Sequence, residues 1–220
     1  MIEVSIMPEP FYIGSLNVGL SVVVSWGVIA AIILLLLLAQ KRIRNFTELP
    51  RGLQSVLELM VGALHDFARS QVGDKADFVA PAILTLMVYV FATTFIELFG
   101  LPPATEDINC TLGLGLSAFL LVNVTAVRSL GLRGRLAAWT KPSAAATPIR
   151  VLTDFITPFS MAVRLFANVL AGGVIMKLVY MVVPIAVPAA LGVYFNILHV
   201  AIQTFVFGML PLLYISEATE

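Results

Sequence analysis

Apolar stretches of membrane-spanning length recur along this sequence of 220 residues. The first runs from Leu16 to Ala39, about as long as the roughly 20 residues that cross a bilayer as a helix. Charged residues make up only 12% of the chain and hydrophobic residues 60%, whereas a soluble domain needs more charge to cover its surface. Lipid must therefore be part of the solvent, and we predict an all-α integral membrane protein.

The apolar stretches and the breaks between them predict five spanning helices and one surface helix in a single membrane domain, residues 1–220. The parts are a first span at 16–39, a surface amphipathic helix at 50–72, a two-span hairpin at 80–127, a basic loop at 128–148 and a long tilted helical hairpin at 149–217. The surface helix is predicted because Val56, Met60 and Leu64 recur at helical spacing with polar residues between them.

The long hairpin must be tilted because its first helix is too long to stand upright. Residues 149–183 form one mostly apolar helical stretch, which at 1.5 Å per residue exceeds the hydrocarbon layer of about 30 Å. Such a helix tilts strongly or curves. Pro184 and Pro188 mark the turn, and the last helix follows.

Basic residues predict the orientation of the chain. Segments 41–79 and 128–150 hold these eleven of the thirteen lysines and arginines: Lys41, Arg42, Arg44, Arg51, Arg69, Lys75, Arg128, Arg133, Arg135, Lys141 and Arg150. Five spans with the N-terminus outside place all eleven on one side of the membrane, which is the side that basic loops favour.

Three ionisable residues fall inside predicted spans, where an unpaired charge is costly. Lys177 lies near the end of its helix and can reach the headgroups with its long stem. Glu97 also lies near the end of its span, so interfacial water and a proton path are equally good explanations. Arg164 has 15 residues of helix before it and 19 after it, so it is a fixed charge deep in the span. Asp154 is ten residues earlier, about 15 Å along the axis, which favours a partner from another chain.

Polar and small residues accompany Arg164. Asn168 follows it by one helical turn, and the small residues Ala167, Ala171, Gly172 and Gly173 would let another helix approach closely. On the last helix Asn196, His199 and Gln203 form one polar stripe. The stripe is either a set of interhelical hydrogen bonds or a wet path for ions, in which a histidine would titrate near neutral pH.

Several kinds of site have no visible sequence basis. The net charge is zero, so no nucleic-acid partner is suggested. No phosphate-binding glycine loop, HExxH motif or paired Cys/His cluster is present, so no metal or cofactor is expected. The single cysteine, Cys110, has no partner for an internal disulfide.

The segment SMAVRLFANVLAGG, residues 160–173, resembles the S-x-x-x-RLF-[GA]-N-x-x-AG signature of subunit a of the rotary F-type ATP synthase. Three more segments resemble that family in the same order: PRGLQSVLE at 50–58, LPPATEDINCTLGLGL at 101–116 and IQTFVFGMLPLLYIS at 202–216. Ser160, Asp107 and Asn109 fall on motif positions and are secondary site candidates.

The resemblance implies a stator subunit that is not catalytic alone but conducts protons within an ATP synthase. In this family two aqueous half-channels, offset across the membrane, lead to the carboxylates of a c-subunit ring, and Arg164 matches the essential arginine that separates them. The implied partners are the c-subunit ring, a membrane subunit of the peripheral stalk and the lipid bilayer.

The chain departs from the family pattern where titratable residues are usual. Gly173 and Asn196 stand where many members have glutamate or histidine, and Arg150 stands where a glutamate usually precedes the arginine by 14 residues. We predict that Asp154 is the acid of the half-channel on the basic-loop side. Glu97 and His199 are predicted to supply the missing groups of the other half-channel.

Two alternatives stay open, a stand-alone secondary transporter and a structural membrane subunit whose Arg164 pairs internally. A transporter predicts inverted repeats, and no convincing repeat relates the two halves. The RLFAN block, in place of RLFGN, favours a mitochondrial inner membrane slightly over a bacterial plasma membrane.

Overall fold

The computed structural model describes residues 10–13, 16–43, 52–99, 101–139, 147–182, 191–192 and 194–219. The elements in chain order are strands β1 (Pro10–Ile13) and β2 (Leu16–Gly19), helices α1 (Leu20–Ile43) and α2 (Leu53–Val72), the 3-10 turn η1 (Gly73–Lys75), helix α3 (Ala76–Phe95), the 3-10 turns η2 (Ile96–Phe99) and η3 (Ala104–Glu106), helices α4 (Ile108–Ala138) and α5 (Thr147–Val182), the π-helix η5 (Tyr194–His199) and helix α7 (Val200–Ala218).

The all-α membrane class predicted from the sequence is confirmed. Within the described residues, five helical stretches are long and apolar enough to cross a membrane: Leu20–Gln40, Gln54–Phe95, Ile108–Ala138, Thr147–Val182 and Ile197–Ala218. The one addition is a short antiparallel hairpin of β1 and β2 before α1. Because β2 takes residues 16–19, the first helix begins at Leu20 rather than at Leu16.

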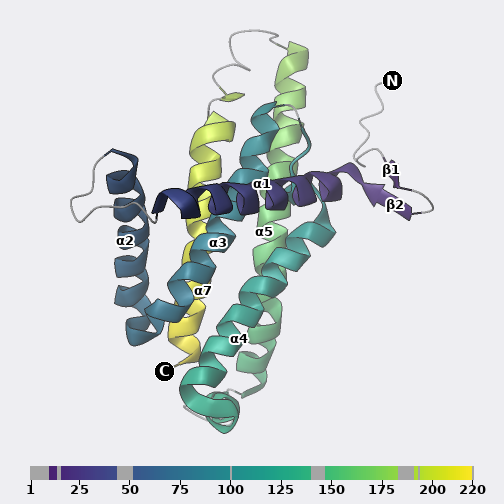
Figure 1. Ribbon diagram of the computed structural model, residues 1–220. Coiled ribbons are helices and arrows are strands. Elements are labelled where there is room, and N and C mark those ends of the chain that lie inside the picture. The colour runs from purple at the N-terminus through teal and green to yellow at the C-terminus, as the bar shows by residue number, and fades with distance from the viewer. Residues whose placement is uncertain are drawn as a thin grey trace.

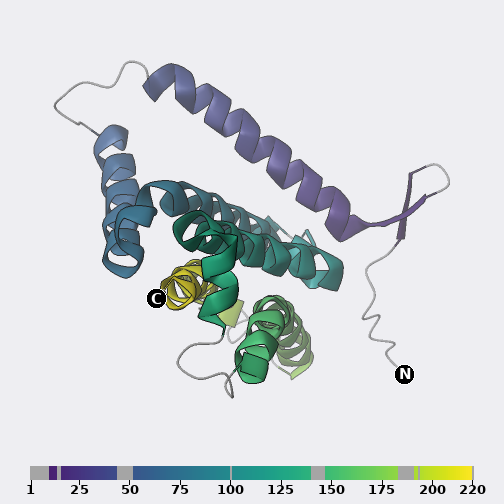
Figure 2. The ribbon, with the colours of Figure 1, turned by 90° about the horizontal axis from the view of Figure 1, so that it is seen from below.

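Helix α1 crosses the direction of α5 and α7 in both views (Figures 1 and 2). With 24 residues, α1 is about 36 Å long, enough to cross a bilayer upright. If α1 stands along the membrane normal, the 36 residues of α5 run strongly tilted through the bilayer, in agreement with the tilt that its length predicts. Helix α2 also lies crosswise to α1, beyond its C-terminal end (Figure 1), as a surface helix would.

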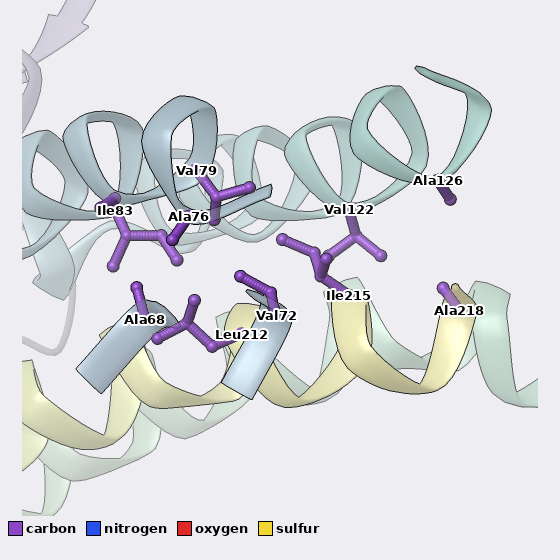
Figure 3. Packing of buried hydrophobic residues seen from close by; sticks show 11 residues of the cluster. Ala68, Val72, Ala76, Val79, Ile83, Val122, Ala126, Leu212, Ile215 and Ala218 are labelled. Atoms are coloured by element: carbon purple, nitrogen blue, oxygen red, sulfur yellow. The ribbon is translucent and has the colours of Figure 1, made fainter. Parts of the chain in front are cut away.

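Four helices enclose the core, and α7 lies at its centre. Leu212 and Ile215 of α7 are buried against Val79 and Ile83 of α3 and Val122 of α4, and Ala68 and Val72 of α2 close the same cluster (Figure 3). A second cluster joins α3, α4 and α7 to Met161 and Leu165 of α5. Only 6% of the apolar window of α5 is buried, so most of this helix faces outward.

The predicted loop at 128–148 is wrong in its first half, because α4 continues to Ala138. Leucine, arginine and alanine in this stretch are good helix formers, which accounts for the continuation of the helix. Gly131 interrupts the helix with φ 72° and ψ 166°, a backbone conformation that glycine adopts without strain. The last turns of α4 therefore change direction, and this change shapes the site described below.

Gly115 of α4 permits the close approach of α5. A Cβ at this position would overlap the carbonyl oxygen of Pro158 and lie 3.3 Å from the Cβ of Ala162. Replacing Gly115 by alanine is therefore expected to destabilise the α4–α5 contact by about 1–3 kcal/mol. The measurement is the thermal unfolding midpoint of the detergent-purified complex. Gly113→Ala on the same helix is the control, since a Cβ there meets nothing within 4 Å, and equal losses in both variants would contradict the prediction.

Candidate functional site

Arg164 lies on the outward face of α5. Its neighbours Met161, Ala162 and Leu165 are buried against the bundle, whereas Arg164 itself is exposed. Exposed residues at helical spacing continue this face in both directions: Ile156, Ser160, Val163, Ala167, Ala171 and Val174. Among the described residues no carboxylate forms an ion pair with Arg164. Asp154, which the spacing along the helix places too far from Arg164 for direct contact, is bound by Arg135 and Trp139, and the charge of Arg164 lies on an exposed surface of apolar and small residues.

One helical turn beyond Arg164, a partly buried hydrogen bond links α5 to α7. The amide nitrogen Nδ2 of Asn168 donates to Oε1 of Gln203 over 2.6 Å. Gln203 is buried, and within the described part of the chain its Nε2 has no hydrogen-bond partner. The structure thus brings together Asn168, which follows Arg164 by one turn, and Gln203, which belongs to the polar stripe of the last helix.

The Asn168–Gln203 pair borders a cavity of about 200 Å³ that we name the Glu97 cavity. It lies where the end of α3, the second half of α5 and the π-helix η5 meet. Its lining residues are Thr94, Glu97, Asn168, Val169, Gly172, Met176, Tyr180 and His199. Three predicted site residues, Glu97, Asn168 and His199, therefore share one cavity although they come from three separate elements.

His199 is the last residue of the π-helix, and η5 passes directly into α7. A π-helical turn adds a residue to the helical repeat and often occurs at functional sites. Asn196 belongs to the same turn, but its side chain lies outside the part of the structure that is described. Glu97 lies in the 3-10 turn η2, just after α3, and is half-buried.

A second cavity, of about 230 Å³, lies at the other end of α5, and we name it the Asp154 cavity. It is enclosed by the last turns of α4, the first turns of α5 and the C-terminal turns of α7. Its polar lining residues are Arg135, Trp139, Arg150, Thr153, Asp154, Thr157, Tyr214 and Glu217. The cavity adjoins segment 128–150, which holds several of the basic residues. We call this end of the protein its basic side.

Asp154 is held by two donors from the end of α4. Nη2 of Arg135 donates to Oδ2 of Asp154 over 2.5 Å, and Nε1 of Trp139 donates to the same oxygen over 2.8 Å. Arg135 also donates to Oδ1 of Asn123 over 3.2 Å, and its side chain is only 6% exposed. This partly buried ion pair is not predicted from the sequence, in which Arg135 falls in the predicted basic loop. The change of direction at Gly131 is what returns Arg135 to the bundle.

The remaining candidates take peripheral positions. Asp107 caps the N-terminus of α4, and its Oδ1 accepts hydrogen bonds from the backbone nitrogen and Nδ2 of Asn109 over 2.8 and 3.0 Å. Such a cap satisfies a free N–H group of the first helical turn, so Asp107 and Asn109 have a structural role at the start of α4. Ser160 is exposed on the face of Arg164, and Lys177 is exposed toward the end of α5.

Comparisons with a family model and with known proteins point to the same family. The sequence model of the family described as ATP synthase A chain matches residues 22–216. ATP synthase subunit a of Moorella thermoacetica (strain ATCC 39073 / JCM 9320) is 28% identical over 214 residues, covering 95% of this chain and 94% of that protein. The chloroplastic ATP synthase subunit a of Stigeoclonium helveticum is 34% identical over 218 residues, covering 92% of this chain and 85% of that protein.

Proposed function

Since the chain belongs to the ATP synthase A chain family, the proton-conducting stator subunit of the rotary ATP synthase, we propose that its two cavities are the inner parts of two half-channels and that Arg164 separates them. Subunits of this family work in a complex with the c-subunit ring, in an energy-transducing lipid membrane. The proposal concerns how this particular chain divides the proton path.

The position of Arg164 along α5 carries the proposal. The residues of α5 that line the Asp154 cavity end at Thr157, and those that line the Glu97 cavity begin at Asn168. Ten residues lie between these two positions, which are about 16 Å apart along the helix, and Arg164 is one of the ten. A proton that entered one cavity would meet this fixed charge before it reached the other.

The exposure of Arg164 supports a partner outside the chain. A guanidinium on an apolar membrane-facing surface is costly unless an anion or water compensates it, and within the described residues no carboxylate does so. A carboxylate of the c-subunit ring that passes α5 would be favoured in its ionised form by the nearby positive charge. It would lose its proton into one half-channel and regain a proton from the other.

Under this proposal, protons move along the polar side chains that line or border the two cavities. Glu97, His199 and the Asn168–Gln203 pair serve the half-channel on one side, together with Asn196 as predicted from the sequence. Asp154 lines the half-channel on the basic side. The small exposed residues Ala167 and Ala171 beside Arg164 would let the ring helices approach closely.

Two finer predictions remain. The peripheral-stalk membrane subunit would bind α1 and α2, because only 11% of the apolar window of α1 is buried and Leu59 and Met60 of α2 are 72% and 62% exposed. A mitochondrial inner membrane is still only a prediction, since the two relatives are a bacterial and a chloroplastic protein.

Thiol labelling from each side of the membrane tests the two half-channels. Cys110 is the single cysteine of the chain, so Cys110→Ala removes the native thiol of this subunit, and labelling of the introduced cysteines is read on the separated subunit after reaction of the complete complex. Thr157→Cys in the Asp154 cavity should react with a membrane-impermeant thiol reagent only from the basic side. Gly172→Cys in the Glu97 cavity should react only from the opposite side.

Leu165→Cys is the matched control, because Leu165 is 1% exposed, adjoins Arg164 and lines neither cavity. It should react from neither side. Right-side-out and inverted vesicles that contain the whole complex give the two directions. Reaction of Thr157→Cys and Gly172→Cys from the same side would refute the proposal of two separated half-channels.

A further inference from the structure

The Asp154 cavity contains more charged groups than a simple proton path requires. Two guanidiniums, Arg135 and Arg150, and two carboxylates, Asp154 and Glu217, line the same space. Tyr214 is the other titratable side chain that lines it. Only a carboxylate that can gain and lose a proton readily can pass protons on, so the surroundings of the two acids decide which of them has this role.

Asp154 is poorly placed to exchange protons. Its Oδ2 accepts hydrogen bonds from both Arg135 and Trp139, and protonation of either carboxylate oxygen would weaken the charge-assisted hydrogen bond with Arg135. Protonation would also remove the counter-ion of a guanidinium whose side chain is 6% exposed. Leaving one charge of a buried pair uncompensated is strongly unfavourable, so this pair is suited to staying ionised.

The Arg135–Asp154 pair also has a clear structural use. It fastens the last turns of α4, after the break at Gly131, to the first turns of α5. Arg150 is similarly tied to this region, since its Nη1 donates to the carbonyl oxygen of Ala138 over 3.4 Å. Together these contacts hold one wall of the cavity.

Glu217 is in a different situation. It lies in the last turn of α7, is exposed, and lines the same cavity as Arg135, Arg150 and Asp154. Within the described residues it forms no ion pair. A carboxylate that is exposed outside the protein and also lines the cavity can accept a proton on one side and release it on the other.

On the basis of the proposed half-channels, we propose that Glu217 is the proton-exchanging carboxylate of the Asp154 cavity, while Arg135 and Asp154 form a permanently ionised pair that positions its wall. Glu217 takes a proton from a hydronium ion at the membrane surface, which leaves as water. It then gives that proton to water in the cavity, on the way to the ring carboxylate, and becomes a carboxylate again. Reversing the direction of rotation reverses both transfers.

The test measures ATP-driven proton pumping and proton-driven ATP synthesis by the complete complex in vesicles, against pH on the basic side. Glu217→Gln should lower both rates on the order of tenfold and flatten their pH dependence, because a positioned proton carrier is lost. Glu217→Asp should keep the pH dependence of the parent. Asp74→Asn, which removes an exposed carboxylate outside the cavity, is the control and should leave both rates unchanged.

The ion pair is tested by Arg135→Gln, Asp154→Asn and the double variant. Each single variant should lower the yield of assembled complex, and the double variant should recover both yield and the pH dependence of the parent. Parent rates and pH dependence in Glu217→Gln would overturn the inference. So would a double variant that assembles but shows the flattened, tenfold lower rates expected of Glu217→Gln.

The outcomes for this inference and for the proposed function can be told apart. If thiol labelling separates the two cavities while Glu217→Gln pumps normally, the half-channels stand and only the part assigned to Glu217 fails. If labelling reaches both cavities from one side, the half-channels themselves fail, whatever the rates of Glu217→Gln.

Discussion

Replacing Arg164 by alanine is expected to abolish ATP-driven proton pumping while the complex still assembles. Arg164 is exposed and makes no ion pair with another described residue, so its removal costs the fold no buried contact. The substitution should instead affect the ring carboxylate, which would no longer meet a positive charge that favours its ionised form. We expect coupled pumping to fall by roughly 100-fold or more, the usual effect of removing a preorganised charge from a reaction site.

Two further variants sharpen this prediction. Lys177→Ala removes the next cation along α5 after Arg164, which is exposed and 13 residues further along the helix, and it should pump at nearly the parent rate. Arg164→Lys keeps a charge but loses the planar guanidinium, and a lysine can also give up its proton in an apolar setting. It should therefore lie closer to Arg164→Ala than to the parent.

The result also separates the functions that the sequence left open. A structural subunit, or a transporter that works without a ring, does not need Arg164 for coupling to ATP hydrolysis. Quenching of a pH-sensitive dye in inverted vesicles, with assembly checked by co-purification of the ring, is the measurement. Parent-level pumping by an assembled Arg164→Ala complex would refute the assignment of Arg164 as the residue that separates the half-channels.

The second large effect is expected for Glu97→Gln. Glu97 supplies the one carboxylate among the described residues that line the Glu97 cavity, where it shares the space with His199 and Asn168. The amide is similar in size but cannot carry a proton, so proton-driven ATP synthesis should fall on the order of tenfold to 100-fold. Glu97→Asp, which keeps the carboxyl group on a shorter stem, should retain an intermediate rate.

Glu106→Gln is the matched control for Glu97→Gln. Glu106 lies nearby in η3 and is half-buried, but it does not line the cavity. Its replacement should leave synthesis close to the parent rate. Full proton-driven synthesis by Glu97→Gln would remove Glu97 from the proton path.

Local sequence patterns were enough to predict the membrane class, and they single out the tilt of α5 and the central arginine as predictions. Apolar stretches longer than a bilayer is thick leave few folds open, because lipid offers the backbone no hydrogen-bond partners. The cost of an unpaired charge in lipid singles out Arg164 from its place in the helix alone. The helical spacing of Asn196, His199 and Gln203 likewise indicates a polar face. His199 lines the Glu97 cavity, and Gln203 is hydrogen-bonded to Asn168, which also lines it. For Asn196 only the backbone is described.

The tertiary structure decided which polar groups share a site and which are already paired. Glu97 and His199 are about 100 residues apart, and they meet only because the end of α3 reaches the junction of η5 and α7. Arg135 and Asp154 meet because Gly131 adopts φ 72° and turns the end of α4 back toward α5. The spacing of residues in a sequence shows which side chains are neighbours along one helix. Contacts between distant elements depend instead on the packing of the whole bundle. That packing holds Asp154 in an ion pair and leaves Arg164 exposed, and neither outcome follows from the spacing of residues along one helix.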